Sequence, residues 1–182
     1  QKRLHHIKFK GAIFTNFSQD HLDYHKTMKV YLNAKLVLFK KILLKNSTII
    51  SDKEIYQFKL LKKIAQNRNL KILDINQELI KLKNTSFKSN DDFKIKNLAM
   101  AIKIAKLCDL KEKSIYKVIK KLKDVTGRLE LIRNFQNNIK VYIDYAHTPD
   151  ALFKTIKFLK NNYGDNISLV FGCGGERDKK KR

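Results

Sequence analysis

Cysteine is scarce in this sequence and a long apolar run is absent, so several classes of protein are excluded at once. The only two cysteines, Cys108 in a helical pattern and Cys173 in a glycine-rich turn, form neither a disulfide framework nor a zinc-binding motif. No stretch approaches the roughly 20 apolar residues that span a bilayer, and residues 1–4 contain no apolar signal region. We therefore predict free thiols, no membrane insertion and a cytoplasmic location.

Acidic residues are also few: 17 Asp and Glu stand against 40 Lys and Arg, for a formal net charge of +23. Such a charge raises nucleic acid as a partner, so a basic nucleic-acid-binding module is one alternative for the function. The lysines, however, are spread along the chain and do not form one stripe. We favour a solvated lysine surface, part of which attracts phosphate-bearing substrates, and expect no nucleic-acid partner.

Three polar segments each follow a short apolar run, and this arrangement indicates the fold. TNFSQDHLDYH follows AIF, DYAHTP follows VYI, and GCGGERD follows SLVF. Runs of this kind are typical of strands buried on both faces in parallel sheets, where ligands bind at the carboxyl ends. The sequence therefore predicts an α/β enzyme.

The alternation of patterns adds the expected elements. We expect helices at 27–45, 54–67, 93–108 and 112–124, with strands at 47–51 and 70–75 and an irregular segment or short strands at 77–91. After a composition break at Thr126-Gly127 we expect strands at 129–132, 140–144 and 167–171, and a helix that begins after Thr148 and ends at Gly164. The predicted domains are 1–125 and 126–182.

The first polar segment suggests a metal site. Asp20, His21, Asp23 and His25 lie close together in the sequence, and oxygen-rich surroundings suit Mg²⁺ better than zinc. The alternative is a polar loop that caps the following helix. Lys35 falls on the apolar stripe of that helix, where an ammonium is costly unless it is neutralised, paired, chemically used or able to reach water along its stem.

The string FTNFSQDHLDYHKTMKVYLNAKLVLF, residues 14–39, closely resembles the central ATPase domain of the Mur ligases, specifically the tripeptide synthetases of the MurE type. The resemblance implies a P-loop-type central domain, built on a mostly parallel sheet with helices, that binds ATP and Mg²⁺. It also implies that Lys35 is carbamylated and that His21 helps to hold the Mg²⁺ beside the phosphates. A neutral buried amine is what reaction with CO₂ requires, which agrees with the place of Lys35.

Further strings extend the resemblance into a Rossmann-like C-terminal domain. DDFKIKNLAMAIKIA is similar to the family's adenine-contacting segment, with Asn97 at its second asparagine and Lys94 in place of its first. GRLELI and DYAHTPDAL imply that Arg128 lies near the ATP phosphates, that Asp144 accepts from the ribose hydroxyls and that His147 lies near the nucleotide. GCGGERDKKKR implies substrate binding by Arg177 and Asp178.

The resemblance implies an ATP-dependent ligase that adds a diamino acid, meso-diaminopimelate or L-lysine, to UDP-N-acetylmuramoyl-L-alanyl-D-glutamate through an acyl phosphate. We assign Lys35, His21 and Arg128 to catalysis and expect a monomer. The sequence holds no G-x-x-x-x-G-K-[ST] loop and no DNPR motif, so we expect an internal fragment without activity of its own. A folylpolyglutamate or cyanophycin synthetase type of ligase is the nearer alternative.

Overall fold

The computed structural model describes residues 7–85 and 91–172. Its described part divides into two compact units. Unit 1 comprises Gln1–Phe17 and Lys29–Lys121, and unit 2 comprises Ser18–Met28 and Leu122–Arg182, each taken for its described residues.

Unit 1 is built on a parallel sheet, as predicted. Strands β1 (Gly11–Phe14), β2 (Thr48–Ser51) and β3 (Lys71–Asp74) pair in the order β1-β2-β3, with Ile49 of β2 between Ala12 and Ile72. Every residue of the central strand β2 is buried, because it has a partner on each edge and helices on each face. The predicted α/β fold class is confirmed.

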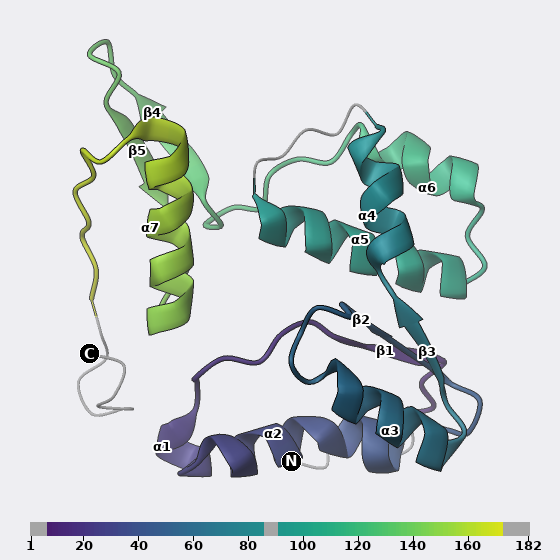
Figure 1. Ribbon diagram of the computed structural model, residues 1–182. Coiled ribbons are helices and arrows are strands. Elements are labelled where there is room, and N and C mark those ends of the chain that lie inside the picture. Colours follow the sequence, from purple (N-terminus) through teal and green to yellow (C-terminus); the bar gives the residue numbers. More distant parts are fainter. Residues whose placement is uncertain (1–6, 86–90, 173–182) are drawn as a thin grey trace. The chain divides into compact units, whose positions relative to one another are not determined.

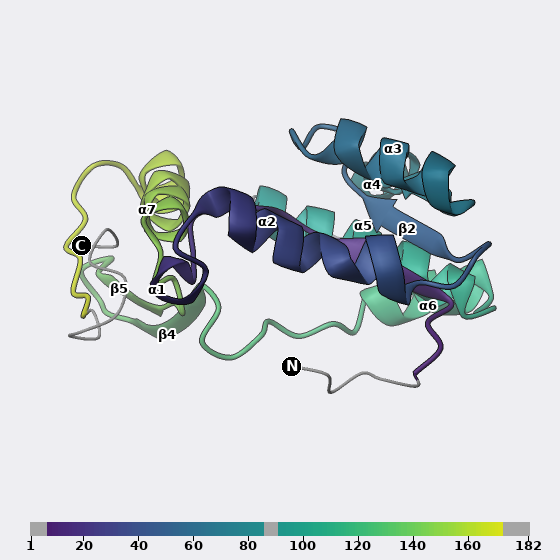
Figure 2. The ribbon, with the colours of Figure 1, turned by 90° about the horizontal axis from the view of Figure 1, so that it is seen from below.

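Helices cover both faces of this sheet (Figures 1 and 2). On one face lie α2 (Met28–Val37), the π-helical turn η1 (Leu38–Ile42) and α3 (Phe58–Arg68). On the other lie α4 (Asn76–Lys83), α5 (Asp92–Leu107) and α6 (Glu112–Ile119). Ile49 joins the first apolar cluster and Ile50 the second, since successive side chains of a strand point to opposite faces.

One glycine permits the close packing of α5 on the sheet. A Cβ at Gly11 would collide with the side chain of Leu107 and lie 3.0 Å from the backbone oxygen of Thr48. At the other end of α5, the carboxylate of Asp91 accepts from the backbone N–H groups of Phe93 and Lys94 and so caps the helix. Helix α5 is thus fixed against β1 at one end and terminated cleanly at the other.

Three expected elements of unit 1 differ in the structure. Residues 76–83 form helix α4, where we expected irregular structure or short strands. The helix forms because Ile75, Leu79 and Leu82 have helical spacing and pack into the second cluster. The expected helix 27–45 is interrupted by the π-helical turn at 38–42. The helix expected at 112–124 ends at Ile119.

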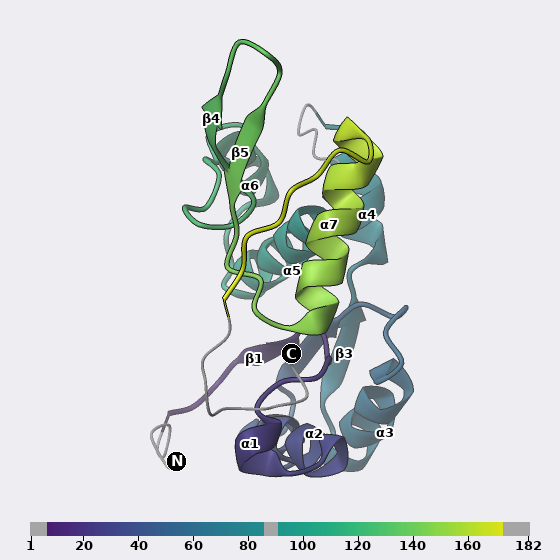
Figure 3. The same ribbon diagram turned by 90° about the vertical axis from the view of Figure 1, so that its left-hand side faces the viewer.

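Unit 2 contains a hairpin and one long helix (Figure 3). Strands β4 (Glu130–Asn134) and β5 (Lys140–Ile143) pair antiparallel with a bulge between Leu131 and Arg133. Helix α7 (Pro149–Tyr163) begins as predicted, with the Thr148 hydroxyl accepting from the Ala151 N–H. A short helix, α1 (Leu22–His25), lies in the first segment of this unit.

The strand expected at 167–171 is wrong: the structure has neither strand nor helix there. Val170 is 97% exposed and Phe171 61%, and Val141 and Ile143 of β5 are exposed as well. The expectation that 141–143 and 168–171 are buried on both faces is therefore wrong too. An apolar segment becomes a buried strand only where neighbouring backbone pairs with it, and no described strand pairs with 167–171.

Candidate functional site

The carboxylate of Asp144 joins three segments of unit 2. It directly follows β5, and its Oδ1 accepts from the backbone N–H groups of Tyr145 at 2.9 Å and Leu129 at 3.2 Å. Its Oδ2 accepts from the hydroxyl of Thr155, on α7, at 2.6 Å. A strand-end aspartate thus fixes the turn before β4, the turn after β5 and the helix against one another.

The turn before β4 presents Arg128. Its guanidinium lies over the ring of Tyr145, 4.4 Å from the ring centroid, and both side chains are on the exposed surface. Gly127 and Leu129 flank it with φ of 68° and 50°, and the carboxylate of Glu130 accepts from the Gly127 N–H. Since a leucine at positive φ is strained, the hydrogen bond from Leu129 to Asp144 helps to hold this conformation.

Two histidines flank a second carboxylate in unit 2. Oδ1 of Asp20 accepts from the backbone N–H of His21, and its Oδ2 lies 3.4 Å from His21 Nε2 and 3.7 Å from His147 Nε2. The Asp20 side chain is 19% exposed. Nδ1 of His147 donates to the backbone oxygen of Tyr145, which connects this group to the turn at Asp144. The structure thus brings together His21, Asp20 and His147.

Lys35 lies on α2 in unit 1. The deeply buried side of its helix is formed by Leu36, Phe39 and Leu43, so Lys35 stands at the border of the apolar stripe and is half-buried. Its Nζ lies 5.7 Å from the ring centroid of Phe14, at the end of β1, and 5.3 Å from that of Tyr31. Both contacts are of the cation–π kind.

Asn97 is exposed on α5, and its neighbour Lys96 makes a contact that the sequence analysis missed. Lys96 Nζ lies 2.8 Å from the carboxylate of Asp52, whose side chain is 3% exposed, and 3.4 Å from that of Asp92. The ion pair with Asp52 raises the pKa of Lys96, more than burial lowers it. Asp52 follows the apolar run of β2, a signal of the same kind as the one used for Asp144.

The residues assigned from the sequence divide between the units. Lys35 and Asn97 lie in unit 1, whereas His21, Arg128, Asp144 and His147 lie in unit 2. Arg177 and Asp178 fall outside the described residues. Their roles in catalysis and binding stay predictions.

The donor set offered for Mg²⁺ is small but chemically suitable. Across residues 7–85 and 91–172 no group of three or more His, Cys, Asp or Glu side chains is arranged to hold a metal ion. Asp20 and His21 supply one carboxylate and one imidazole side by side. Mg²⁺ commonly binds one or two protein groups and completes its shell with phosphate oxygens and water, so these residues fit a nucleotide-bound ion.

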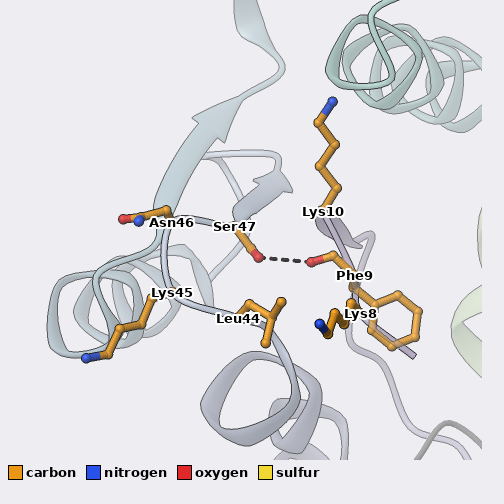
Figure 4. Close-up of a pocket in the computed structure, with 7 residues that line it drawn as sticks. All are labelled: Lys8, Phe9, Lys10, Leu44, Lys45, Asn46 and Ser47. Carbon is orange, nitrogen blue, oxygen red and sulfur yellow. Dashed lines mark hydrogen bonds between the residues drawn. The ribbon is translucent and has the colours of Figure 1, made fainter. Parts of the chain in front are cut away.

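In unit 1 a surface depression of about 350 Å³ lies at the amino-terminal edge of the parallel sheet (Figure 4). It is lined by residues 8–10 and 44–47, and the Ser47 hydroxyl donates to the backbone oxygen of Phe9 inside it. The side chains of Lys10 and Lys45 point away from each other, and Lys10 pairs with Asp109 at 2.7 Å. These lysines therefore do not converge on one point of the depression.

The chain matches two protein families in succession. The Mur ligase middle domain matches residues 1–111, and the Mur ligase glutamate ligase domain matches residues 127–182.

No described helix is long and apolar enough to cross a membrane.

Named relatives cover the whole chain. It is 36% identical to a UDP-N-acetylmuramoyl-L-alanyl-D-glutamate–2,6-diaminopimelate ligase of Rickettsia montanensis, over 100% of this chain and 42% of that protein. It is 32% identical to the enzyme of that name from Clostridium botulinum, over 99% of this chain and 41% of that protein. The chain thus spans about two fifths of the length of these relatives.

Solved structures agree with these relatives. A structure of a UDP-N-acetylmuramoyl-L-alanyl-D-glutamate–2,6-diaminopimelate ligase matches with a TM-score of 0.61 and 30% identity, over 99% of this chain and 41% of that one. MurF from Acinetobacter baumannii matches with a TM-score of 0.64 over 86% of this chain and 38% of that one, and at 13% identity supports the fold alone. Two family matches in succession, supported by relatives of the same kind over the whole chain, establish that this chain belongs to the Mur ligase family.

Proposed function

We propose that this chain is part of an ATP-dependent ligase that adds diaminopimelate to UDP-N-acetylmuramoyl-L-alanyl-D-glutamate during peptidoglycan synthesis. The observation that supports this most is the succession of middle and glutamate ligase domains, with diaminopimelate ligases similar over the whole chain. We assign residues 1–125 and 126–182 to these two domains. The proposal includes a cytoplasmic monomer that does not bind nucleic acid.

The reaction requires an acyl phosphate. The side-chain carboxylate of the substrate's glutamate attacks the γ-phosphorus of ATP, and ADP leaves. The amine of the diamino acid then attacks the acyl carbon, loses a proton and expels phosphate as the amide forms. Catalysis of this kind depends on positioning and on neutralisation of charge at the phosphates.

Arg128 has the surroundings that such a role needs. Its guanidinium is exposed, held over Tyr145 and next to a turn fixed by Asp144, so it can bridge two phosphate oxygens with little loss of entropy. Asp144 would accept from the ribose, and His147 would lie beside the nucleotide. Asn97 would contact the adenine, and Arg177 and Asp178 the substrate.

His21 would hold Mg²⁺, with the carboxylate of Asp20 beside its imidazole. The ion would supply neutralisation of phosphate charge. Lys35 would contribute an oxygen ligand as its carbamate, which requires the amine to lose its proton. The amine that would react with CO₂ lies beside Phe14 and Tyr31.

The proposal is tested with the protein that carries this chain, ATP, Mg²⁺, the dipeptide nucleotide and either meso-diaminopimelate or L-lysine. We expect ADP release and a new amide only when both substrates are present, with diaminopimelate preferred. With ¹⁸O in the glutamate carboxylate, one label should pass to the released phosphate. ADP release without that transfer would contradict an acyl phosphate, and an inert mixture would contradict the ligase itself.

An arginine pair provides a matched comparison. Arg128→Ala should lower kcat by about 10²-fold or more, because it removes a donor at the developing phosphate charge. Arg133→Ala is the control. Arg133, on β4, also lies over an aromatic ring, that of Phe135, 4.8 Å from the ring centroid. Equal losses in both variants would mean that Arg128 acts only through the fold.

A further inference from the structure

We infer that Thr155 is a positioning residue for the nucleotide site, and that it leaves the Asp144 carboxylate with one open acceptor position, enough for one ribose hydroxyl. The ligand part of this inference rests on the proposed function. Thr155 was not singled out by any sequence motif, and it reaches Asp144 from the middle of α7.

The first step is a count of acceptor positions. A carboxylate oxygen has two lone pairs, so Asp144 can accept about four hydrogen bonds in all. Oδ1 already accepts from Leu129 and Tyr145, which uses both of its lone pairs. Among the described residues Oδ2 accepts from Thr155, so one position on Oδ2 is left for a ligand. The sequence-based expectation of contacts with both ribose hydroxyls is narrowed to one.

The second step concerns orientation. Without Thr155 the carboxylate could rotate about its Cβ–Cγ bond, since backbone donors hold only Oδ1. The hydroxyl of Thr155 donates to Oδ2 at 2.6 Å, a short bond of the charge-assisted kind. It fixes the plane of the carboxylate and with it the direction of the open lone pair.

The third step leads from Asp144 to Arg128. The two backbone groups that Oδ1 holds belong to Leu129, next to Arg128, and to Tyr145, whose ring lies under the guanidinium. Thr155 therefore acts on both components of the Arg128–Tyr145 stack through one carboxylate.

The test compares Thr155→Val and Thr155→Ser with the unchanged protein that carries this chain. Hydrogen–deuterium exchange is followed in peptides covering 127–131 and 143–147. Thr155→Val keeps the shape but loses the donor, and we expect exchange in both peptides to rise roughly ten-fold. Thr155→Ser keeps the donor and should restore protection.

Tyr163→Phe is the matched control. Tyr163 also lies on α7 and accepts a hydrogen bond from Tyr142 of the hairpin at 2.6 Å, without contact to Asp144. It should leave both peptides unchanged. Unaltered exchange in Thr155→Val, failure of Thr155→Ser to restore it, or an equal rise in Tyr163→Phe would each overturn the positioning role.

The open acceptor is tested with ATP, 2′-deoxy-ATP and 3′-deoxy-ATP. One deoxy analogue should bind roughly ten-fold more weakly than ATP and the other as well as ATP, because Asp144 accepts from a single hydroxyl. If both analogues bind more weakly than ATP, or if neither does, the inference that Asp144 accepts from a single ribose hydroxyl is wrong. If the unchanged protein binds no ATP, the proposed function and the ligand part fail together, and the exchange data still decide the role of Thr155.

Discussion

Strands β2 of unit 1 and β5 of unit 2 each carry β-branched apolar residues but differ in burial. Ile49 and Ile50 of β2 are 0% exposed, whereas Val141 and Ile143 of β5 are 41% and 50% exposed. The strands themselves do not account for this difference. What differs is their surroundings: β2 has a strand on each edge and helices on both faces, while β5 has one partner strand.

The comparison extends to the residues assigned to function. In unit 1, apolar packing fixes the elements, and buried charges such as Asp52 and Glu78 add to it. In unit 2, Asp144 fixes the turns at Arg128 and Tyr145 by hydrogen bonds, and Arg128 and Tyr145 are exposed. Of the residues proposed to meet the nucleotide, Arg128 and Asp144 in unit 2 thus depend on a polar arrangement more than on a core.

The largest expected effect comes from removing apolar contacts in β2. Ile50→Ala should lower the free energy of unfolding by about 3–4 kcal/mol, because it leaves a cavity in a region that packs on all sides. Ile143→Ala in β5 should cost less than about 1 kcal/mol, since half of that side chain is in contact with water. Urea unfolding of both variants measures this, and similar losses would refute the contrast between the strands.

The next largest effect is expected at Glu78, a buried residue that is 2% exposed. Tyr116 donates to it at 2.9 Å, Lys106 donates to it at 2.8 Å, and Lys103 lies 3.7 Å away. Burial alone would raise the pKa of Glu78, but these hydrogen bonds and charges outweigh it, so the pKa lies below its ordinary value. Glu78→Gln should cost about 2–3 kcal/mol at neutral pH.

The pH dependence of Glu78 has a definite sign. Since its pKa is lowered in the folded state, its contribution is fully present above the ordinary glutamate pKa and is lost as pH falls through the folded value. The difference in the free energy of unfolding between Glu78→Gln and the unchanged protein should therefore become smaller only at acidic pH. Glu112→Gln is the control, because Glu112 pairs with the same Lys106 but is exposed, and its effect should be much smaller.

Local patterns were enough to predict part of this structure. Apolar runs predicted β1, β2 and β3. Both ends of α7 were predicted from Thr148, Pro149 and Gly164. These features depend on neighbouring residues, whose spacing and capping chemistry are visible in a sequence.

The remaining features depend on partners that are distant in the chain. Asp52 meets Lys96, and Asp144 meets Thr155, only after the strands and helices are assembled. The strand expected at 167–171 failed for the same reason, since an extended run needs a neighbour to pair with. The half-buried place of Lys35 agrees with its predicted position on the helical stripe, but its aromatic neighbour Phe14 comes from β1 and is distant in the chain.

A smaller effect is expected at Lys96, whose side chain is 30% exposed. Lys96→Met should cost about 1–2 kcal/mol, because it leaves Asp52 buried without its cation, though partial exposure reduces the loss. The pKa of Lys96 is raised, so its contribution is present below the ordinary lysine pKa and is lost as pH rises through the folded value.

The double variant Lys96→Met with Asp52→Asn sharpens this prediction. It removes the charge that the single variant leaves buried and should recover part of the stability. The measurement is urea unfolding at neutral pH and again above the ordinary lysine pKa. A double variant that is less stable than Lys96→Met alone would mean that the hydrogen bond which Asp52 accepts from the Glu54 N–H matters more than removal of the unpaired charge.

The smallest effect is expected at the tyrosine pair of unit 2. Burial and the hydrogen bond to Tyr163 raise the pKa of Tyr142 to about 12, so the folded state resists ionisation of that phenol. Its contribution is fully present below the ordinary tyrosine pKa of 10 and is lost between there and about 12. Tyr163→Phe should lower the Tyr142 pKa, measured by ultraviolet titration, and cost about 0.5 kcal/mol. Because this bond lies at the surface of a unit with little apolar packing, a loss approaching that of Ile50→Ala would show that unit 2 relies on single hydrogen bonds for its stability as well as for its geometry.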